Sequence, residues 1–399
     1  MKVSFFVREF PVYSETFITD QITGLIDRGF DVNIITLKKN THSEIQPVID
    51  YNLMDKVIEL PCDYGLGMTA TIKSLLSIVK SFPNKTFRHY LHDGIKRKKR
   101  GAEELAAILQ TKTTITSDKI IAHFGPNAVM AMKLSKMGVL SGKVYGVFHG
   151  YDMSRISYLD KYLVDYKELF KTDMMALPVS EFWQDKLMEF GCPKEKITVN
   201  RMGVDIKQFS FKPKLIRSPL RILSVARHTE KKGLEYAIKA MALLKKEGID
   251  FAYNIAGTGP LMEKHQNLID ELDLSDNVKL LGMKNHQEVN TLLEDSDVFV
   301  LPSVTPEDGD KEGIPVSLME AMAKGVICLS TLHSGIPELI KHEESGFLVE
   351  EKNPEQIARV LQEIMEKDLS QYYIKGRSKI ANDFNQQKEY DKLAKLLAL

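Results

Sequence analysis

Short apolar runs recur along the chain and alternate with stretches in which apolar residues follow helical spacing. The first run, Val3 to Val7, is continuous, as expected of a parallel strand buried on both faces. Apolar residues at helical spacing follow from Phe17 to Ile26, and a second run spans Val32 to Leu37. This order predicts an open α/β sheet. Further strands are predicted at 119–124, 143–148, 174–179, 220–226, 251–256, 278–281, 298–301 and 346–349.

The predicted strands fall into two groups, separated by a polar stretch with two prolines between Lys207 and Pro219. The length of 399 residues is enough for two domains of ordinary size. We therefore predict four parts of the chain. They are a first domain at 1–206, a linker at 207–219, a second domain at 220–384 and a closing helix at 385–399.

Composition and charge narrow the class of protein. Hydrophobic residues make up 43% and charged residues 27%, which is typical of a soluble globular protein, and the formal net charge is zero. A chain without net positive charge is not expected to bind nucleic acid. The three cysteines have no metal-ligand spacing, and no apolar stretch approaches the length of a membrane span. We expect a cytoplasmic protein.

One basic run stands out within a helical stretch at 66–110. It consists of Lys96, Arg97, Lys98, Lys99 and Arg100. A basic amphipathic segment can lie on an anionic membrane surface, which predicts peripheral contact with the inner face of the plasma membrane. A charge run is also typical of a plain solvated face, so both interpretations stay open.

The stretch KEGIPVSLMEAMAK, residues 311–324, carries the strongest chemical pattern. Glu312 precedes a Gly-Ile-Pro turn, and Glu320 follows on the predicted helix after seven intervening residues. Gly313 lets the backbone approach a ligand, and Pro315 suits the first helical turn. Main-chain amides at a helix N-terminus bind anions. Those expected here belong to Ile314, Val316 and Ser317. Two carboxylates for hydroxyl groups and an anion site for phosphate together suit a sugar nucleotide.

This spacing resembles the Glu-x7-Glu signature of the retaining glycosyltransferases of family 4, which have the GT-B fold. The longer stretch PSVTPEDGDKEGIPVSLMEAMAKG, residues 302–325, resembles the enzymes that build exopolysaccharide repeat units, such as colanic acid and amylovoran glycosyltransferases. The resemblance implies two Rossmann-like domains that face each other across a cleft. It also implies that the last helix, 388–397, packs back on the first domain.

The resemblance assigns roles to several residues. Glu320 would bind the ribose and Glu312 the hydroxyls of the transferred sugar. Arg227 and Lys232 would bind the diphosphate, with Lys231 as the neighbouring alternative. His149, at the end of a predicted strand, would orient the donor sugar. Further donor contacts are predicted at Asp152, Glu15, Thr16, Met283 and Lys284.

The function implied is retaining transfer of a hexose from a nucleotide-sugar, with a UDP-sugar favoured, to a lipid-linked acceptor in exopolysaccharide or surface polysaccharide synthesis. No cofactor or bound metal is expected, because GT-B enzymes usually work without one. Asp308 and Asp310 mimic a metal-binding pair but are interpreted as a loop. Two alternatives remain: a sugar-nucleotide epimerase of the same fold, and a non-catalytic sugar-nucleotide-binding assembly protein.

Overall fold

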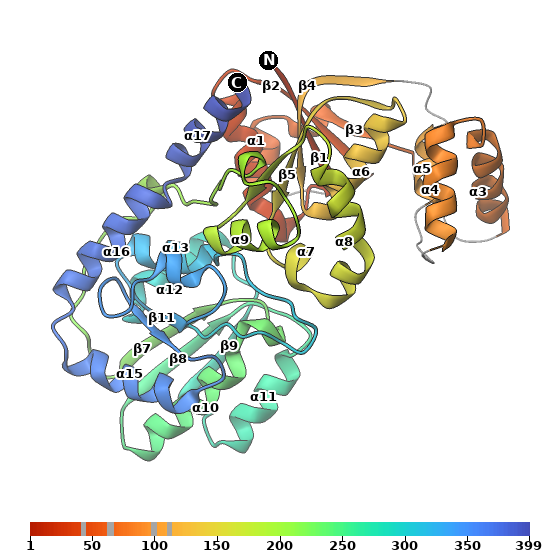
Figure 1. Cartoon of the computed structure of the whole chain (residues 1–399). Helices are drawn as coiled ribbons and strands as arrows, with labels where there is room; N and C mark the ends of the chain where they lie inside the picture. Colours follow the sequence, from red (N-terminus) through yellow and green to blue (C-terminus); the bar gives the residue numbers. More distant parts are fainter. Residues whose placement is uncertain (41–44, 62–67, 97–101, 110–113) are drawn as a thin grey trace.

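The computed structural model describes residues 1–40, 45–61, 68–96, 102–109 and 114–399. Within these ranges the strands form two sheets of six, each flanked by helices (Figure 1). The strand orders are β3-β2-β1-β4-β5-β6 and β12-β11-β10-β7-β8-β9. All pairings between these strands are parallel. The predicted α/β fold of two Rossmann-like domains is confirmed.

The first sheet has its centre at β1, whose residues Phe5 and Phe6 are fully buried. Its strands are β1 (Lys2–Phe10), β2 (Asp31–Lys39), β3 (Val57–Glu59), β4 (Ile115–His123), β5 (Leu140–Phe148) and β6 (Met175–Pro178). Its helices are α1 (Thr16–Ile26), α2 (Gln46–Asp50), α3 (Met68–Ser81), α4 (Lys85–Lys96), α5 (Ala102–Leu109), α6 (Gly125–Lys136), α7 (Tyr151–Ser154), α8 (Ile156–Phe170) and α9 (Glu181–Glu189). Helices α3, α4 and α5 form a group at one side of this domain (Figure 1).

The second sheet has separate apolar clusters of buried residues, one that includes residues of α10 and α15 and one that includes residues of α13. Its strands are β7 (Leu220–Val225), β8 (Phe251–Ala256), β9 (Val278–Gly282), β10 (Val298–Leu301), β11 (Ile327–Thr331) and β12 (Phe347–Val349). Its helices are α10 (Leu234–Lys246), α11 (Met262–Glu271), α12 (His286–Asp295), α13 (Val316–Lys324), α14 (Ile336–Leu339), α15 (Pro354–Glu366) and α16 (Ser370–Asp383).

The last helix, α17 (Gln386–Ala398), returns to the first domain, as predicted (Figure 1). Leu393 and Leu397 are buried in the core of the first sheet. Arg28 of the segment after α1 forms an ion pair with Asp391 at 2.7 Å. The C-terminal segment thereby ties the second domain to the first. None of the helices in the described ranges combines the length and the apolar character that crossing a membrane requires.

Candidate active site

The two domains meet through the loops that follow β5 and β10. A methyl group on Gly150 would lie 2.8 Å from the carbonyl oxygen of Lys311, and one on Gly313 would lie 2.5 Å from that of His149. Neither position has room for a side chain, which explains why glycine occupies both. The segment 311–324, which contains Glu312 and Glu320, is therefore packed directly against the first domain.

Glu312 and Lys232 form an ion pair inside this contact. The Lys232 Nζ lies 2.8 Å from the Glu312 Oε1, and both side chains are largely buried. Burial alone would raise the pKa of Glu312, but the charges of Lys232 and then Lys231 outweigh it and hold the pKa at about 2. Glu312 is thus a carboxylate at neutral pH. Its carbonyl oxygen accepts a hydrogen bond from the Trp183 indole of the first domain at 3.2 Å.

A hydrogen-bonded chain from three strand ends supports the backbone of Glu312. The Glu312 amide donates to the Nε2 of buried His333 at 3.1 Å, so Nε2 is the acceptor and the ring proton lies on Nδ1. That Nδ1 lies 2.6 Å from the Oε1 of Glu351. The other carboxylate oxygen of Glu351, Oε2, accepts from the amide of Thr305 at 2.7 Å. Burial would raise the pKa of Glu351, but the hydrogen bonds from His333 and Thr305 lower it to about 2.

The start of helix α13 lies directly after this buried acid. Pro315 is the N-cap, no side chain caps the helix, and no acidic residue occupies its first turn. Val316 and Ser317 are the first two helical residues, and the side chain of Ile314 is buried. Uncapped amides and the positive end of the helix dipole favour an anion here. The structure therefore brings Gly313 to Ser317 together with Glu312 and Lys232.

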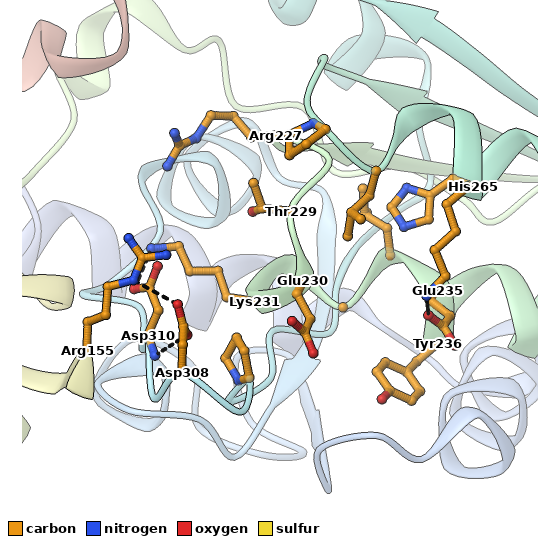
Figure 2. A pocket seen from close by; sticks show the side chains of 16 residues that line it. Arg155, Arg227, Thr229, Glu230, Lys231, Glu235, Tyr236, His265, Asp308 and Asp310 are labelled. Atoms are coloured by element: carbon orange, nitrogen blue, oxygen red, sulfur yellow. Dashed lines mark hydrogen bonds and ion pairs between the residues drawn. The ribbon is translucent and has the colours of Figure 1, made fainter. Parts of the chain in front are cut away.

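Arg227 lies at the carboxyl end of β7 with its side chain exposed. It borders a cavity of about 560 Å³ that Thr229, Lys231 and His265 also line (Figure 2). Across the domain contact lies Glu15, whose pKa is raised by burial and by Glu9 and lowered by the charge of Arg227. Arg227 is placed to attract an anion at the cleft.

Asp308 and Asp310 are occupied by cationic side chains, as Figure 2 shows. Arg155 of the first domain donates to Asp308 at 2.7 Å, and Lys231 lies 3.1 Å from Asp310. No group of three metal-ligating side chains gathers among the residues that the structure describes. The pair therefore serves as a contact between the domains. Lys231 is engaged with it, which leaves Lys232 as the lysine beside Glu312.

Glu320 lies on α13 and is electrostatically coupled to Asp20 on helix α1 of the first domain. Burial is the main cause that raises the pKa of Glu320 to about 7, and Asp20 adds to it. Burial likewise raises the pKa of Asp20 to about 6. The charge of Asp20 thus acts on Glu320 across the domain contact, and at neutral pH the two carboxyl groups retain part of their protons.

His149 follows β5 and is partly exposed, and its ring packs against that of Phe124 at a centroid distance of 4.4 Å. Asp152, for which a donor contact is predicted, lies beneath the loop that carries His149. The Asp152 carboxylate is fully buried and accepts from the amides of Gly125 and Gly150, each at 2.8 Å, and of His149 at 3.1 Å. It shapes the loop that holds His149 and has no exposed side chain for a ligand.

The remaining predicted residues lie on other elements of the two domains. Thr16 is the first residue of α1. Met283 is 76% exposed after β9, and Lys284 forms an ion pair with Glu288 at 3.0 Å. The basic run from 96 to 100 ends α4 with Lys96 and otherwise lies outside the described residues.

Several site residues were missed by sequence reasoning. His333 lies in the loop after β11, and nothing nearby in the chain indicates its link to Glu351 and Thr305. Asp20 lies on a helix whose polar positions resemble any solvated face. A signal exists only in position: Thr305 and Glu351 follow predicted strands of the second sheet. His333 follows β11, which was not predicted, and the carboxyl ends of these strands share one edge.

Comparison with known proteins agrees with this geometry. The family of glycosyl transferases group 1 matches residues 205–382. The putative colanic acid biosynthesis glycosyltransferase WcaL of Escherichia coli K12 is 43% identical over 410 residues, covering 100% of this chain and 99% of the relative. The amylovoran biosynthesis glycosyltransferase AmsK of Erwinia amylovora is 42% identical over 408 residues, with coverage of 100% and 99%.

Solved structures share the whole architecture. HepE of Anabaena in complex with UDP-glucose has a TM-score of 0.72 at 15% identity, and the match covers 100% of this chain and 99% of that one. At such low identity the likeness shows the fold alone, which is the two-domain GT-B arrangement. With full-length relatives above 40% identity, the chain is a glycosyltransferase that belongs to the group 1 family.

Proposed function

We propose that the protein is a retaining glycosyltransferase that moves a hexose from a UDP-sugar to a lipid-linked saccharide in exopolysaccharide synthesis, without a bound metal. The observation that carries the proposal is the buried ion pair between Glu312 and Lys232 beside the uncapped start of α13. A role in exopolysaccharide synthesis is supported by the names of the full-length relatives, which are colanic acid and amylovoran biosynthesis glycosyltransferases. We also propose that the chain divides, as predicted, into a first domain at 1–206, a linker at 207–219, a second domain at 220–384 and a closing helix at 385–399.

The donor would lie along the edge of the second sheet. Glu320 would accept hydrogen bonds from the ribose, as the resemblance implies, and the exposed loop at Met283 and Lys284 would border the base. The diphosphate would lie against Arg227, Lys232 and the amides at the start of α13. A uridine donor is supported by the fold relative that holds UDP-glucose, although that likeness extends to the fold alone.

The proposed reaction breaks the bond between the sugar carbon C1 and the diphosphate oxygen. The acceptor hydroxyl oxygen bonds to C1 on the same face, and its proton passes to the departing diphosphate. Negative charge grows on that leaving group, so Arg227, Lys232 and the helix end stabilise the transition state more than the ground state. Glu312 would hold the sugar hydroxyls, and His149 would orient the sugar from the first domain.

Helix α3 favours contact with a membrane that carries the lipid-linked acceptor. Leu75, Leu76 and Val79 lie on one face of this helix and are 58%, 53% and 67% exposed. Lys80 and Lys85 are exposed nearby, and lysines attract anionic lipids. Apolar side chains beside basic ones suit an interfacial helix. We therefore propose peripheral attachment to the inner face of the plasma membrane.

Product analysis tests the proposed reaction. The protein would be incubated with UDP-glucose, UDP-galactose or GDP-mannose, with and without undecaprenyl-diphosphate-linked saccharide, in the presence of EDTA. We expect a longer lipid-linked product from a UDP-sugar, with the anomeric configuration of the donor retained in the NMR spectrum. An inverted product contradicts retention. An altered sugar nucleotide formed without acceptor indicates an epimerase, and no conversion of any donor contradicts catalysis.

A further inference from the structure

A buried chain of hydrogen bonds leads away from His149 into the first domain. The His149 Nε2 lies 3.0 Å from the Nδ1 of His123, at the end of β4. The His123 Nε2 lies 3.0 Å from the Oε1 of Gln21 on α1. The amide nitrogen of Gln21 donates to the Oδ1 of Asn200 at 3.3 Å. Four residues from separate parts of the domain thus form one path.

The direction of each hydrogen bond follows from the Gln21 amide. Its nitrogen faces Asn200, so its carbonyl oxygen faces the His123 Nε2 and can only accept. The His123 proton must then lie on Nε2, which leaves the His123 Nδ1 as an acceptor. The His149 Nε2 must in turn donate to it. The His149 Nδ1 is left without a proton, and it has no hydrogen-bond partner among the residues that the structure describes.

Both rings are held in place by aromatic neighbours. His123 is fully buried and stacks on Phe5 at a centroid distance of 5.9 Å. His149 packs against Phe17 at 5.0 Å and also against Phe124. Burial lowers the pKa of His123 to about 3, and burial together with His123 lowers the pKa of His149 well below its usual value. Both rings are therefore neutral at physiological pH, and only the choice of tautomer remains.

We propose that His123 and Gln21 are positioning residues that fix His149 in the tautomer protonated on Nε2, so that its Nδ1 accepts a hydrogen bond from a hydroxyl of the donor sugar. The proposal deepens the proposed function, on which its sugar contact rests. The tautomer itself depends only on the first domain. With the Gln21 amide nitrogen on the Asn200 Oδ1, any other pair of tautomers would set two acceptors or two donors against each other within the first domain.

Nuclear magnetic resonance of the full chain, labelled with ¹⁵N-histidine, tests the tautomer. The His149 signal would be assigned by its loss in His149→Gln. We expect nitrogen shifts of a single tautomer, with a proton on Nε2 that exchanges slowly with water. In His123→Phe, which keeps an aromatic ring, and in Gln21→Met, we expect shifts averaged between two tautomers. Gln21→Glu keeps an acceptor and should retain the wild-type signal.

The matched control is Tyr253→Phe, which removes a buried hydrogen bond to Ser224 in the second sheet. It should leave the His149 signal unchanged. A wild-type His149 with its proton on Nδ1, or a signal that stays at single-tautomer values in both His123→Phe and Gln21→Met, overturns the proposal. Melting temperatures of all variants would show whether each one is folded.

Ligand binding separates this inference from the proposed function. Gln21→Met should weaken UDP-glucose binding about tenfold, the order expected for one hydrogen bond, while UDP binding stays unchanged because UDP lacks the sugar. Gln21→Glu should bind both as the wild type does. Equal loss of both ligands in Gln21→Met overturns the sugar contact. If the wild type binds neither ligand, the proposed function and the sugar contact fail together, and the NMR result still decides the tautomer.

Discussion

The ammonium nitrogen of Lys232 lies 2.8 Å from a carboxylate oxygen of Glu312, and the two side chains come from different strand ends of one sheet. Each charge satisfies the other while no donor is bound. A diphosphate that arrives at the start of α13 would share the lysine, and the sugar hydroxyls would share the carboxylate. The pair thereby keeps both groups charged and oriented before binding, which favours electrostatic preorganisation.

Replacing one member of this ion pair should destabilise the protein more than replacing both. Lys232→Met leaves Glu312 charged and buried, so we expect the free energy of unfolding to fall by about 3–5 kcal/mol. The double variant Lys232→Met/Glu312→Leu should lose much less, because no unpaired charge remains. Denaturant unfolding measures both. Lys171→Met, which breaks an exposed ion pair with Glu168, should have little effect. A loss of unfolding free energy in the double variant that equals the sum of the losses in the two single variants would contradict the account.

The carboxyl groups of Glu320 and Asp20 should make stability depend on pH. Their folded pKa values of about 7 and about 6 lie above the ordinary values of 4.5 and 3.8. A raised acid pKa means that the folded state holds extra protons between about pH 4 and pH 7, so this contribution to stability is present at low pH and is lost as the pH rises.

Asp20→Asn should therefore stabilise the free protein at pH 8, where it removes a buried charge and the repulsion that this charge exerts on Glu320. We expect the melting temperature to rise by roughly 2–4 °C, the shift for about 1 kcal/mol, and to match the wild type at pH 5. Thermal melts at both pH values test this, with the exposed Asp276→Asn as control. An equal shift at pH 5, or a lower melting temperature at pH 8, would show that the two groups do not repel.

His333 should act through the position of Glu312. His333→Ala leaves the buried amide of Glu312 unpaired, and we expect a loss of about 1–3 kcal/mol in stability together with lower turnover. His333→Gln offers another acceptor and should recover part of both. His342→Ala is the matched control, because His342 accepts from the Leu348 amide away from the cleft. Turnover unchanged in His333→Ala would rule out this positioning.

The exposed face of α3 should bind anionic membranes. Leu75→Ser/Val79→Ser should reduce sedimentation with vesicles that contain phosphatidylglycerol, because it removes apolar area from the interface. Ile374→Ser changes a residue of α16 that is 51% exposed, and it should have no effect. High salt should weaken the binding, because it screens the attraction between the basic side chains and the anionic lipids. Equal binding of wild type and double variant would refute the assignment of this face.

The positions of most strands and the segment 311–324 follow from local patterns, whereas the strands β3 and β11 were not predicted. Continuous apolar runs with helical segments between them predict parallel sheets, and the Glu312–Glu320 spacing needs only one turn and one helix. The links from His333 to Glu351, from Asp20 to Glu320 and from His123 to Gln21 join elements far apart in the chain. No local pattern encodes such contacts. The burial of Asp152 is likewise not encoded locally, since it depends on loops folding around it.

The measurement that tests the central claim most directly is a thermal-shift panel with UDP, GDP and ADP in EDTA. At a ligand concentration near 100 Kd, binding adds about 2.7 kcal/mol to stability. We predict a shift with UDP that persists in EDTA, disappears in Arg227→Ala and remains in Arg359→Ala, which alters an exposed arginine of α15. No shift with any nucleotide, or a shift that requires metal, would contradict the account.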